Sequence, residues 1–478
     1  MVMWRMLEFA HRRCGSIICK GAAVPVRRWR AMQQPGPFNA RLARAGLAVV
    51  ALGASVAPLD FALAIAFPAL ADAFALDTRQ VRWAAVCYVL TYGVLMLWTG
   101  ALGDRVGHLR VFALGLLLSI AATVLCAIAP TYGWLLAGRV LMGLGVAFAL
   151  SCAPALAMSL FEDGRRTAVL AAYGGLFALA GLLAPLVGGW AMGLIGWPGV
   201  FWFRVPVVLL ALLGLPLLAK ARAAQAIQAA QVRAAQGQDA KSKQVDKLTP
   251  SAQRVPDGVE PAASASPVSL AWWSAALWRL PGFARVNLAS MLLQFCSFAL
   301  VLVMPFYLAR QGDWHPGAIG LMLGSWAAGS MVGSALAARW VRARGLASAT
   351  QWGVALGALG LLGLLLWPAQ PTAAAVPWLV ATLAVQGLGV GVFQVAYADW
   401  VVAALPAHQR GVAGSLTMVT RTGGVVLGAL IWAEVLQWAG EGDFMRGHRA
   451  VFGAAALLAA GLVAALWCAG RRPAELHT

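Results

Sequence analysis

Four ionisable side chains stand inside long apolar stretches of this sequence. Asp60 lies in VAPLDFALAIAFPAL and Arg139 in LLAGRVLMGLGVA, while Arg204 and Arg421 lie in FWFRVPVV and GSLTMVTRTGGVVLG. A charged side chain at the centre of a membrane span costs on the order of 2.5 to 3.5 kcal/mol on insertion scales. Such residues therefore usually face a cavity and mark the path of an ion or a substrate.

A carboxyl group inside an apolar segment can take up and release a proton. Protonated Asp60 costs little at this depth, whereas ionised Asp60 needs a cation or water beside it. We therefore expect Asp60 to be a proton-coupling residue. The alternative is a static ion pair with an arginine.

Other polar residues in apolar segments are candidates for the wall of a substrate cavity. Arg421 is expected near the middle of its segment, where it could pair with an acid or attract an anionic group. Arg204 is expected close to the outer end of its segment, from where its side chain could reach the surface. The remaining candidates are Gln294, Gln386 and Gln394. Hydrogen bonds between helices would explain these glutamines equally well.

The elements that must position these residues are membrane spans. Of the 478 residues 61% are hydrophobic and 11% are charged, a balance that soluble globular domains of this length do not show. A helix needs about 20 mostly apolar residues to cross a hydrocarbon core of about 30 Å. We predict twelve spans, at residues 45–70, 80–99, 111–129, 133–158, 168–191, 199–219, 285–308, 317–338, 348–368, 375–403, 411–436 and 449–470. Two further acids, Asp399 and Glu434, are expected near span ends, where gating or capping contacts are more typical than contact with a substrate.

A long polar stretch, rich in Ala, Gln, Lys and Ser, divides the spans into two sets of six. The predicted divisions are a basic N-terminal extension at 1–44, six-helix bundles at 45–219 and 285–470, a cytoplasmic linker at 220–284 and a tail at 471–478. The linker ends in LAWWSAALWRL, which favours a Trp-rich helix lying in the membrane interface. The expected fold is thus all-α and polytopic, with two pseudo-repeated bundles and a substrate pathway between them.

The distribution of charge predicts the orientation. A net charge of +19 would suggest nucleic-acid binding in a soluble protein, but most Lys and Arg fall in the N-terminal extension, the linker and the loops on their side of the spans. The positive-inside rule therefore predicts a multi-pass protein of the inner (plasma) membrane with both termini in the cytoplasm, and no nucleic-acid partner. Translation could begin at Met32 instead of Met1.

Metal, disulfide and covalent chemistry is not indicated. The seven cysteines are scattered without a CxxC pair, and all six histidines fall in predicted loops or tails. We find no nucleophile-base motif and no phosphate loop. We therefore expect no catalytic site and no cofactor, with a proton gradient as the driving force.

Two glycine-containing motifs suggest close contacts between helices. GALGDRVGHLR, at Gly100–Arg110, falls at an inner turn between two spans. There Asp104 can accept hydrogen bonds from the N-terminus of a neighbouring helix, while Arg105 and Arg110 can reach acids of the next inner loop.

The segment GLFALAGLLAPLVGGWA, at Gly175–Ala191, carries residues that an ordinary helix interior disfavours. Its small-residue surface comprises Gly181, Ala184, Gly188 and Gly189, and lets another helix pack closely. Pro185 is expected to bend the span. A purely structural kink would look the same.

These patterns resemble the major facilitator superfamily. The first motif is similar to motif A, with Gly100, Leu102, Asp104, Arg105 and Gly107 in register. LLAGRVLMGLGVA is similar to motif B. The resemblance covers all twelve spans, and it implies an inner gate held by Asp104 and a role for Arg139 in proton coupling.

Other stretches resemble the drug:proton antiporter branch. RQVRWAAVCYVL at 79–90 and GSLTMVTRTGGVVLG at 414–428 look like its second and eleventh spans. APLVGG is similar to its motif C, with Ala184 in place of the usual glycine. The branch often has an aspartate nine residues before the proline of span one, whereas Asp60 precedes Pro68 by eight. On a regular helix this difference turns the side chain by about 100°.

We therefore expect a monomeric secondary transporter, in the lipid bilayer, that exports small amphipathic or hydrophobic compounds in exchange for protons by alternating access. Asp60 and Arg139 are the coupling candidates. The alternative is a proton-coupled importer of a metabolite or organic anion on the same fold, which Arg204 and Arg421 would favour. Against an enzyme stands the lack of a catalytic motif, and against a sensor the lack of a visible soluble domain.

Overall fold

The computed structural model of the protein describes residues 37–161, 166–245, 282–311, 314–368, 373–404, 410–441 and 443–470. Several predictions lie outside these residues. They concern the first 36 residues, the Trp-rich end of the linker and the C-terminal tail.

Apolar helices build the N-terminal half. They are α3 (Pro37–Ala54), η1 (Pro58–Ala62), α4 (Leu63–Ala73), α5 (Thr78–Val81), α6 (Trp83–Val106), α7 (His108–Ala127), α8 (Tyr132–Met158), α9 (Arg166–Ile195), α10 (Gly199–Trp202), α11 (Arg204–Leu213) and α12 (Leu215–Val245). The elements α3, η1 and α4 together form the first span, and α10 to α12 form the sixth.

The C-terminal half repeats the plan. Its helices are α14 (Phe283–Gln311), α15 (Pro316–Arg344), α16 (Leu346–Leu365), η4 (Ala373–Ala375), α17 (Val376–Ala404), α18 (Arg410–Ala439) and α19 (Phe444–Gly470). Among the described residues there is no strand.

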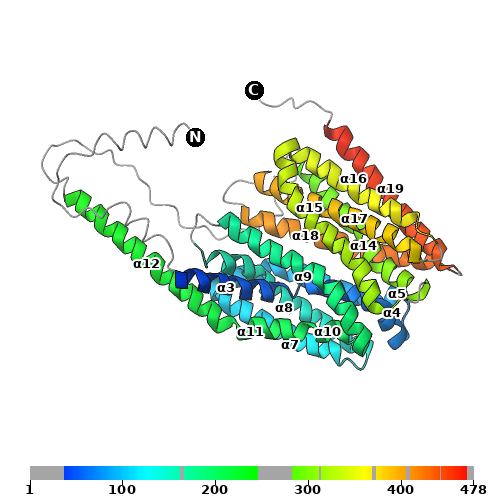
Figure 1. Ribbon diagram of the computed structural model, residues 1–478, viewed down its shortest axis with the longest axis horizontal. Coiled ribbons are helices and arrows are strands. Elements are labelled where there is room, and N and C mark those ends of the chain that lie inside the picture. The colour runs from blue at the N-terminus through cyan, green and yellow to red at the C-terminus, as the bar shows by residue number, and fades with distance from the viewer. Residues whose placement is uncertain are drawn as a thin grey trace.

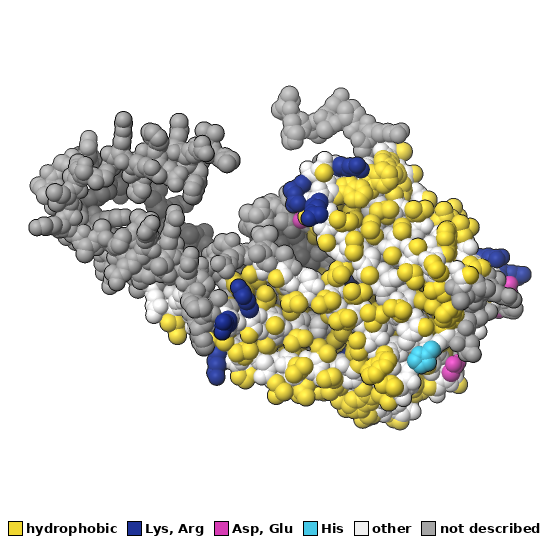
Figure 2. All heavy atoms as spheres, in the orientation of Figure 1, with side chains coloured by type: hydrophobic (Ala, Val, Ile, Leu, Met, Phe, Trp, Pro, Cys, Tyr) yellow, Lys and Arg dark blue, Asp and Glu magenta, His cyan; other side chains and the backbone are white. Residues whose placement is uncertain are grey.

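The helices have the length and surface of membrane spans. Among the described residues, ten helices are each long and apolar enough to cross a membrane, and the number is twelve when each of two bent helix pairs is counted as one span. Large apolar side chains face outward, for example Leu457 and Trp438, which are 76% and 78% exposed. Figure 2 shows a face covered mainly by hydrophobic side chains, with Lys and Arg toward its ends. The predicted all-α polytopic fold is confirmed.

Equivalent helices pack in equivalent ways in the two halves. In the first half α8 packs against α6 and α7, and in the second half α17 packs against α15 and α16. Gly107 and Gly345 end α6 and α15 with φ of 104° and 82°. A side chain is strained in that region, so each tight inner turn requires glycine. The pairing and the turns are those of a pseudo-repeat.

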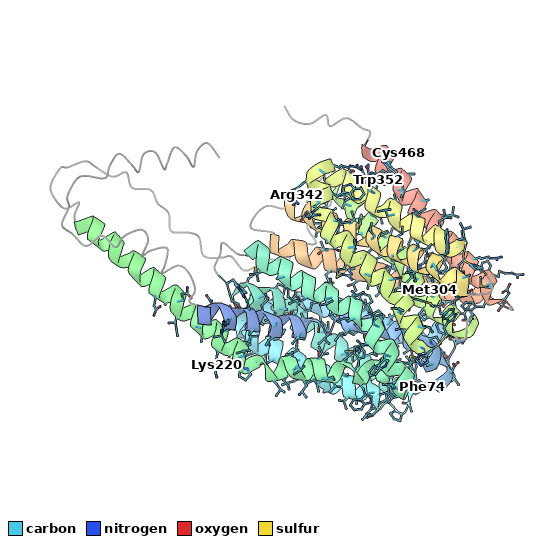
Figure 3. All side chains as sticks on the ribbon, in the orientation of Figure 1. Phe74, Lys220, Met304, Arg342, Trp352 and Cys468 are labelled. Carbon is cyan, nitrogen blue, oxygen red and sulfur yellow. The ribbon has the colours of Figure 1, made fainter. Side chains whose placement is uncertain are left out.

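The two bundles meet along a defined set of helices. Between the halves, α9 packs against α15, α6 against α18 and α4 against α14. In Figure 1 the C-terminal bundle (yellow to red) lies above the N-terminal bundle (blue to green), and the ribbons diverge toward the left. Figure 3 places Lys220 and Arg342 toward that diverging end and Phe74 at the other. We name these the inner and the outer end, after the predicted orientation.

The first part of the predicted linker is helical. The linker was predicted to begin at Lys220, and α12 continues through that position as helix to Val245. Alanine, glutamine and lysine are good helix formers, so span six can extend beyond its apolar part. Figure 1 shows α12 reaching away from the body of the protein at the inner end.

Candidate functional site

A break in span one positions Asp60. The α-helix α3 ends at Ala54, and the chain continues through the 3₁₀ turn η1 before α4 begins at Leu63. The two parts of the span meet at 41°. Pro58 lies at the first position of η1, where its missing N–H leaves no hydrogen bond unmade.

This break bears on the spacing between Asp60 and Pro68. The 100° rotation assumed a regular α-helix between Asp60 and Pro68. A 3₁₀ turn has about 3.0 residues per turn instead of 3.6, so the angular count does not carry across it. In the structure the Asp60 carboxylate faces Arg139.

Arg139 on α8 binds Asp60 with both ends of its guanidinium. Nη1 donates to Oδ1 and Nη2 donates to Oδ2, each at 2.6 Å. Nε donates to the carbonyl of Ala84 at 2.6 Å, and the guanidinium lies 4.4 Å from the centre of the Tyr88 ring. The side chain is fully buried. A bidentate arginine–carboxylate pair is among the stronger and more directional contacts in proteins.

A second arginine completes the cluster. Nη1 of Arg204, on α11, donates to Oδ1 of Asp60 at 2.7 Å. Its Nε and Nη2 are buried and have no hydrogen-bond partner among the described residues. Arg204 is fully buried, so the expectation that it snorkels to the outer face is wrong. Arg204 is the first residue of α11, directly after Phe203, which separates α11 from α10.

A cavity of about 140 Å³ lies between the two bundles. From the N-terminal bundle it is lined by Asp60, and from the C-terminal bundle by Arg421 and Gln294. Aromatic side chains supply much of the wall: Phe61, Tyr88, Tyr92, Phe177, Phe298 and Trp326. Phe61 and Trp326 meet edge to face across the bundles, with ring centroids 5.5 Å apart.

The other two glutamines do not line this cavity. Gln386 lies behind the wall, where it donates to Ser297 Oγ at 2.8 Å and accepts from the indole of Trp326. It therefore orients two lining side chains. The Nε2 of Gln394 is buried with no partner in the described part of the chain. Of the three glutamines, Gln294 is the one in the wall of this cavity.

At the outer end the bundles touch through small residues of α9. A Cβ on Gly189 would lie 2.6 Å from the carbonyl oxygen of Pro316 on α15, and a Cβ on Gly320 would overlap the carbonyl oxygen of Pro185. On the next face of α9, a Cβ on Gly188 would overlap Ala62 of span one. We call this contact of α9 with α15 the outer seam. Gly181 lies opposite Pro58. Ala184 is fully buried.

Charged residues also join the bundles at the outer end. Arg79 and Arg82 reach Glu434 on α18 at 2.8 and 2.9 Å, and Arg82 also donates to the carbonyl of Leu430 at 2.7 Å. Gating or capping contacts were expected for Glu434 from its place near a span end, and its partners are these two arginines. These ion pairs are partly exposed and span the interface between the bundles through α18, apart from the α9–α15 contact.

The motif at Gly100–Arg110, which we call the inner motif, is largely exposed in this structure. Gly100, Arg105 and Arg110 stand at the exposed inner end of α6 and the start of α7, and Gly107 forms the turn between the helices. The described partner of Asp104 is Nε2 of His108, the first residue of α7, at 3.3 Å. The acids Glu162 and Asp163 of the next inner loop lie outside the described residues.

The described residues contain no group of three or more His, Cys, Asp or Glu side chains that could hold a metal ion. The sequence did not single out the individual aromatic residues of the wall or the burial of Arg204. Tyr88, whose ring lies against Arg139, stood only within the motif at 79–90.

Known proteins of similar sequence match this chain over only part of its length. The chain is 33% identical over 163 residues to the methylenomycin A resistance protein of Bacillus subtilis, a match covering 34% of this chain and 35% of that protein. It is 26% identical over 176 residues to the riboflavin transporter RibZ of Clostridioides difficile, covering 36% and 39%. The chain thus spans somewhat over a third of the length of these relatives.

The fold and the family are matched over much more of the chain. The solved structure of the nucleoside transporter NupG superimposes with a TM-score of 0.64 at 11% identity, covering 89% of this chain and 99% of that one. The sequence profile of the Major Facilitator Superfamily matches residues 49–429 and, in a second match, 286–478. The chain belongs to the Major Facilitator Superfamily, whose members are transport proteins and not enzymes.

Proposed function

We propose that this transporter exports small amphipathic or hydrophobic compounds in exchange for protons by alternating access. The observation that carries the proposal is the buried Asp60 cluster at the wall of an aromatic cavity between two bundles that touch at the outer end. Relatives named for methylenomycin A resistance and for tetracenomycin C resistance and export support the outward direction.

In this proposal Asp60 carries the proton. Ionised, it accepts three hydrogen bonds from Arg139 and Arg204. Protonation removes the negative charge that holds the two guanidiniums together, and two buried cations then repel each other. Because the cluster joins span one to spans four and six, proton uptake would change how these helices pack. That change would favour the opposite orientation of the bundles.

Cargo would enter from the inner end and leave through the outer seam. A membrane carrier that works this way needs one end closed while the other is open. Small residues allow α9 and α15 to close the outer end without interdigitating side chains. The inner motif around Asp104 would close the inner end in the opposite state.

The proposal includes an orientation. We place the protein in the inner membrane as a monomer with both termini in the cytoplasm and the linker on the same side. Cys468, exposed at the inner end of α19, tests this. In a variant lacking the other six of the seven cysteines, an impermeant maleimide should label Cys468 only after the cells are permeabilised. Labelling of Cys468 in intact cells would show that this end of α19 faces the outside, which is the opposite orientation.

Transport in inverted membrane vesicles tests the proposed coupling. With an imposed pH gradient, the wild type should accumulate an amphipathic dye, and Asp60→Asn should abolish this accumulation while expression stays normal. Asp72→Asn is the matched control, because Asp72 is exposed on the same span. Unchanged transport by Asp60→Asn would remove the proposed role of Asp60.

A second candidate function is proton-coupled import of a metabolite or organic anion. The half-buried Arg421 at the cavity favours it, and a relative is named a riboflavin transporter. The direction of flux separates the two candidates. Expression of the importer would raise the intracellular level of its substrate, whereas the exporter would lower dye retention and drug sensitivity.

A further inference from the structure

The charges around the cavity do not balance. Asp60 and Arg421 are the charged residues of its wall, and Arg139 and Arg204 bond directly to Asp60. The described part of this region thus holds three cations and one carboxylate. With every group ionised, the region carries a surplus of two positive charges.

The single negative charge is already engaged inside the protein. Both oxygens of Asp60 accept from arginine, and Oδ1 accepts twice. A cationic cargo would have to displace buried, bidentate partners before it could use this carboxylate. In this state, therefore, the cavity offers no free anion to a cation.

Arg421 is placed differently. It stands on α18, half-buried, with its side chain in the cavity wall. No carboxylate among the described residues lies within ion-pair distance of its guanidinium. Five N–H donors in a planar fork suit a carboxylate or another oxyanion. A half-buried cation at this depth stabilises a negative charge better than the same cation in water does.

The rest of the wall selects for a flat apolar body. Aromatic rings approach from both bundles, and Phe61 and Trp326 meet across the interface. A cavity of about 140 Å³ is close to the size of an engineered apolar cavity of about 150 Å³ that binds benzene. An aromatic ring system therefore fits the wall in this state, with its polar group directed to Arg421.

We propose that the cargo is an aromatic compound with one negative charge, and that Arg421 binds the charged group. The inference rests on the proposed function in one respect, that the cargo occupies this cavity. It holds for export and for import alike. The inference excludes lipophilic cations as the preferred cargo.

Three naphthalene compounds of equal ring size test the charge preference. They are 2-naphthoate, 2-naphthylmethanol and 2-naphthylmethylammonium, which are anionic, neutral and cationic at neutral pH. Binding of each radiolabelled compound to the full-length protein in nanodiscs is measured by scintillation proximity. We expect 2-naphthoate to bind most tightly.

Two substitutions assign the preference to Arg421. Arg421→Gln should weaken 2-naphthoate binding about 10- to 100-fold, the range for losing a hydrogen bond to a charged group, and leave 2-naphthylmethanol binding unchanged. Arg421→Lys keeps the charge and should retain a preference for the anion. Retained binding of the neutral compound shows that the variants are folded.

Clear outcomes would overturn the inference. They are equal or tighter wild-type binding of the neutral or cationic compound, no binding of 2-naphthoate, or equal 2-naphthoate affinities in the wild type and Arg421→Gln. The binding assay needs no pH gradient, and its result does not depend on the direction of transport. It can therefore fail while pH-driven export of another compound succeeds, or succeed while Asp60→Asn leaves transport unchanged, so the two proposals fail separately.

Discussion

The two bundles of this transporter meet differently at two levels of the same interface. At the outer seam, backbone lies against backbone, because Gly189 and Gly320 leave no side chain between α9 and α15. At the cavity, aromatic and charged side chains from both bundles line a space between them. Small residues thus supply close contact that can form and separate, whereas buried charges supply an energy that depends on a proton or a cargo.

Replacing Arg139 disrupts the Asp60 cluster at the cavity, and we expect the largest effect from this change. In Arg139→Met, Asp60 keeps only its bond from Arg204. Removing one partner of a buried ion pair costs about 3 to 5 kcal/mol, so we expect a much lower melting temperature in detergent and no transport. Arg342→Met, at an exposed inner position, is the control. Equal stability of the two variants would mean that the Asp60 cluster does not hold this wall together.

Adding one methyl group at Gly320 disrupts the close contact of α9 with α15 at the outer seam. The new Cβ of Gly320→Ala would overlap the Pro185 carbonyl oxygen, so α9 and α15 must separate. Overpacking of this kind costs about 1 to 3 kcal/mol, and we expect slower transport with unchanged affinity for 2-naphthoate. Gly461→Ala adds the same methyl group where nothing lies within 4 Å. Similar transport by both variants would contradict the role of the seam.

Tyr88 packs its ring against the Arg139 guanidinium in the cavity wall. Its ring lies 4.4 Å from the Arg139 guanidinium, and its hydroxyl makes only a long contact of 3.5 Å with the carbonyl of Ala57. We expect Tyr88→Leu to lower stability by about 0.5 to 2 kcal/mol, and Tyr88→Phe to lower it by less, because the ring remains. Thermal unfolding of the two variants measures the difference. If Tyr88→Phe matches Tyr88→Leu, the hydroxyl matters and the ring does not.

Glu434 joins the two bundles at the outer end, and we expect its replacement to have the smallest effect on stability. Its pairs with Arg79 and Arg82 are partly exposed, and such pairs contribute about 0 to 1 kcal/mol. Glu434→Gln should therefore shift the melting temperature slightly at low salt and not at all in about 1 M salt, where screening acts over about 3 Å. A large, salt-independent loss would show that these ion pairs, and not the small residues, close the outer end.

The general fold was readable from the sequence because hydrophobic length is a strong signal. Twelve apolar segments and a polar linker predicted two six-helix bundles, and the described helices have the predicted number of spans when bent pairs are joined. Asp60 and Arg139 were each named as buried charges, since charge in an apolar segment is conspicuous. The sequence offered an arginine partner for Asp60 only as an alternative.

The sequence did not show the break in span one or the burial of Arg204. The η1 turn changes the direction of Asp60, and Arg204 lies fully buried among its neighbours. The positions of both side chains depend on packing against neighbouring spans, and the periodicity of apolar residues in the sequence does not predict that packing. Gln386 shows the same limit, because its partners Ser297 and Trp326 lie on other helices.

Alternating access is the central claim, and locking the outer end tests it most directly. In a background without the seven native cysteines, cysteines replace Arg79 and Glu434, whose side chains meet at 2.8 Å. A bismaleimide with a reducible disulfide then links the bundles. We predict that cross-linked protein in proteoliposomes binds 2-naphthoate but transports nothing, and that reduction restores transport. Transport at the full rate by the cross-linked protein would contradict the account.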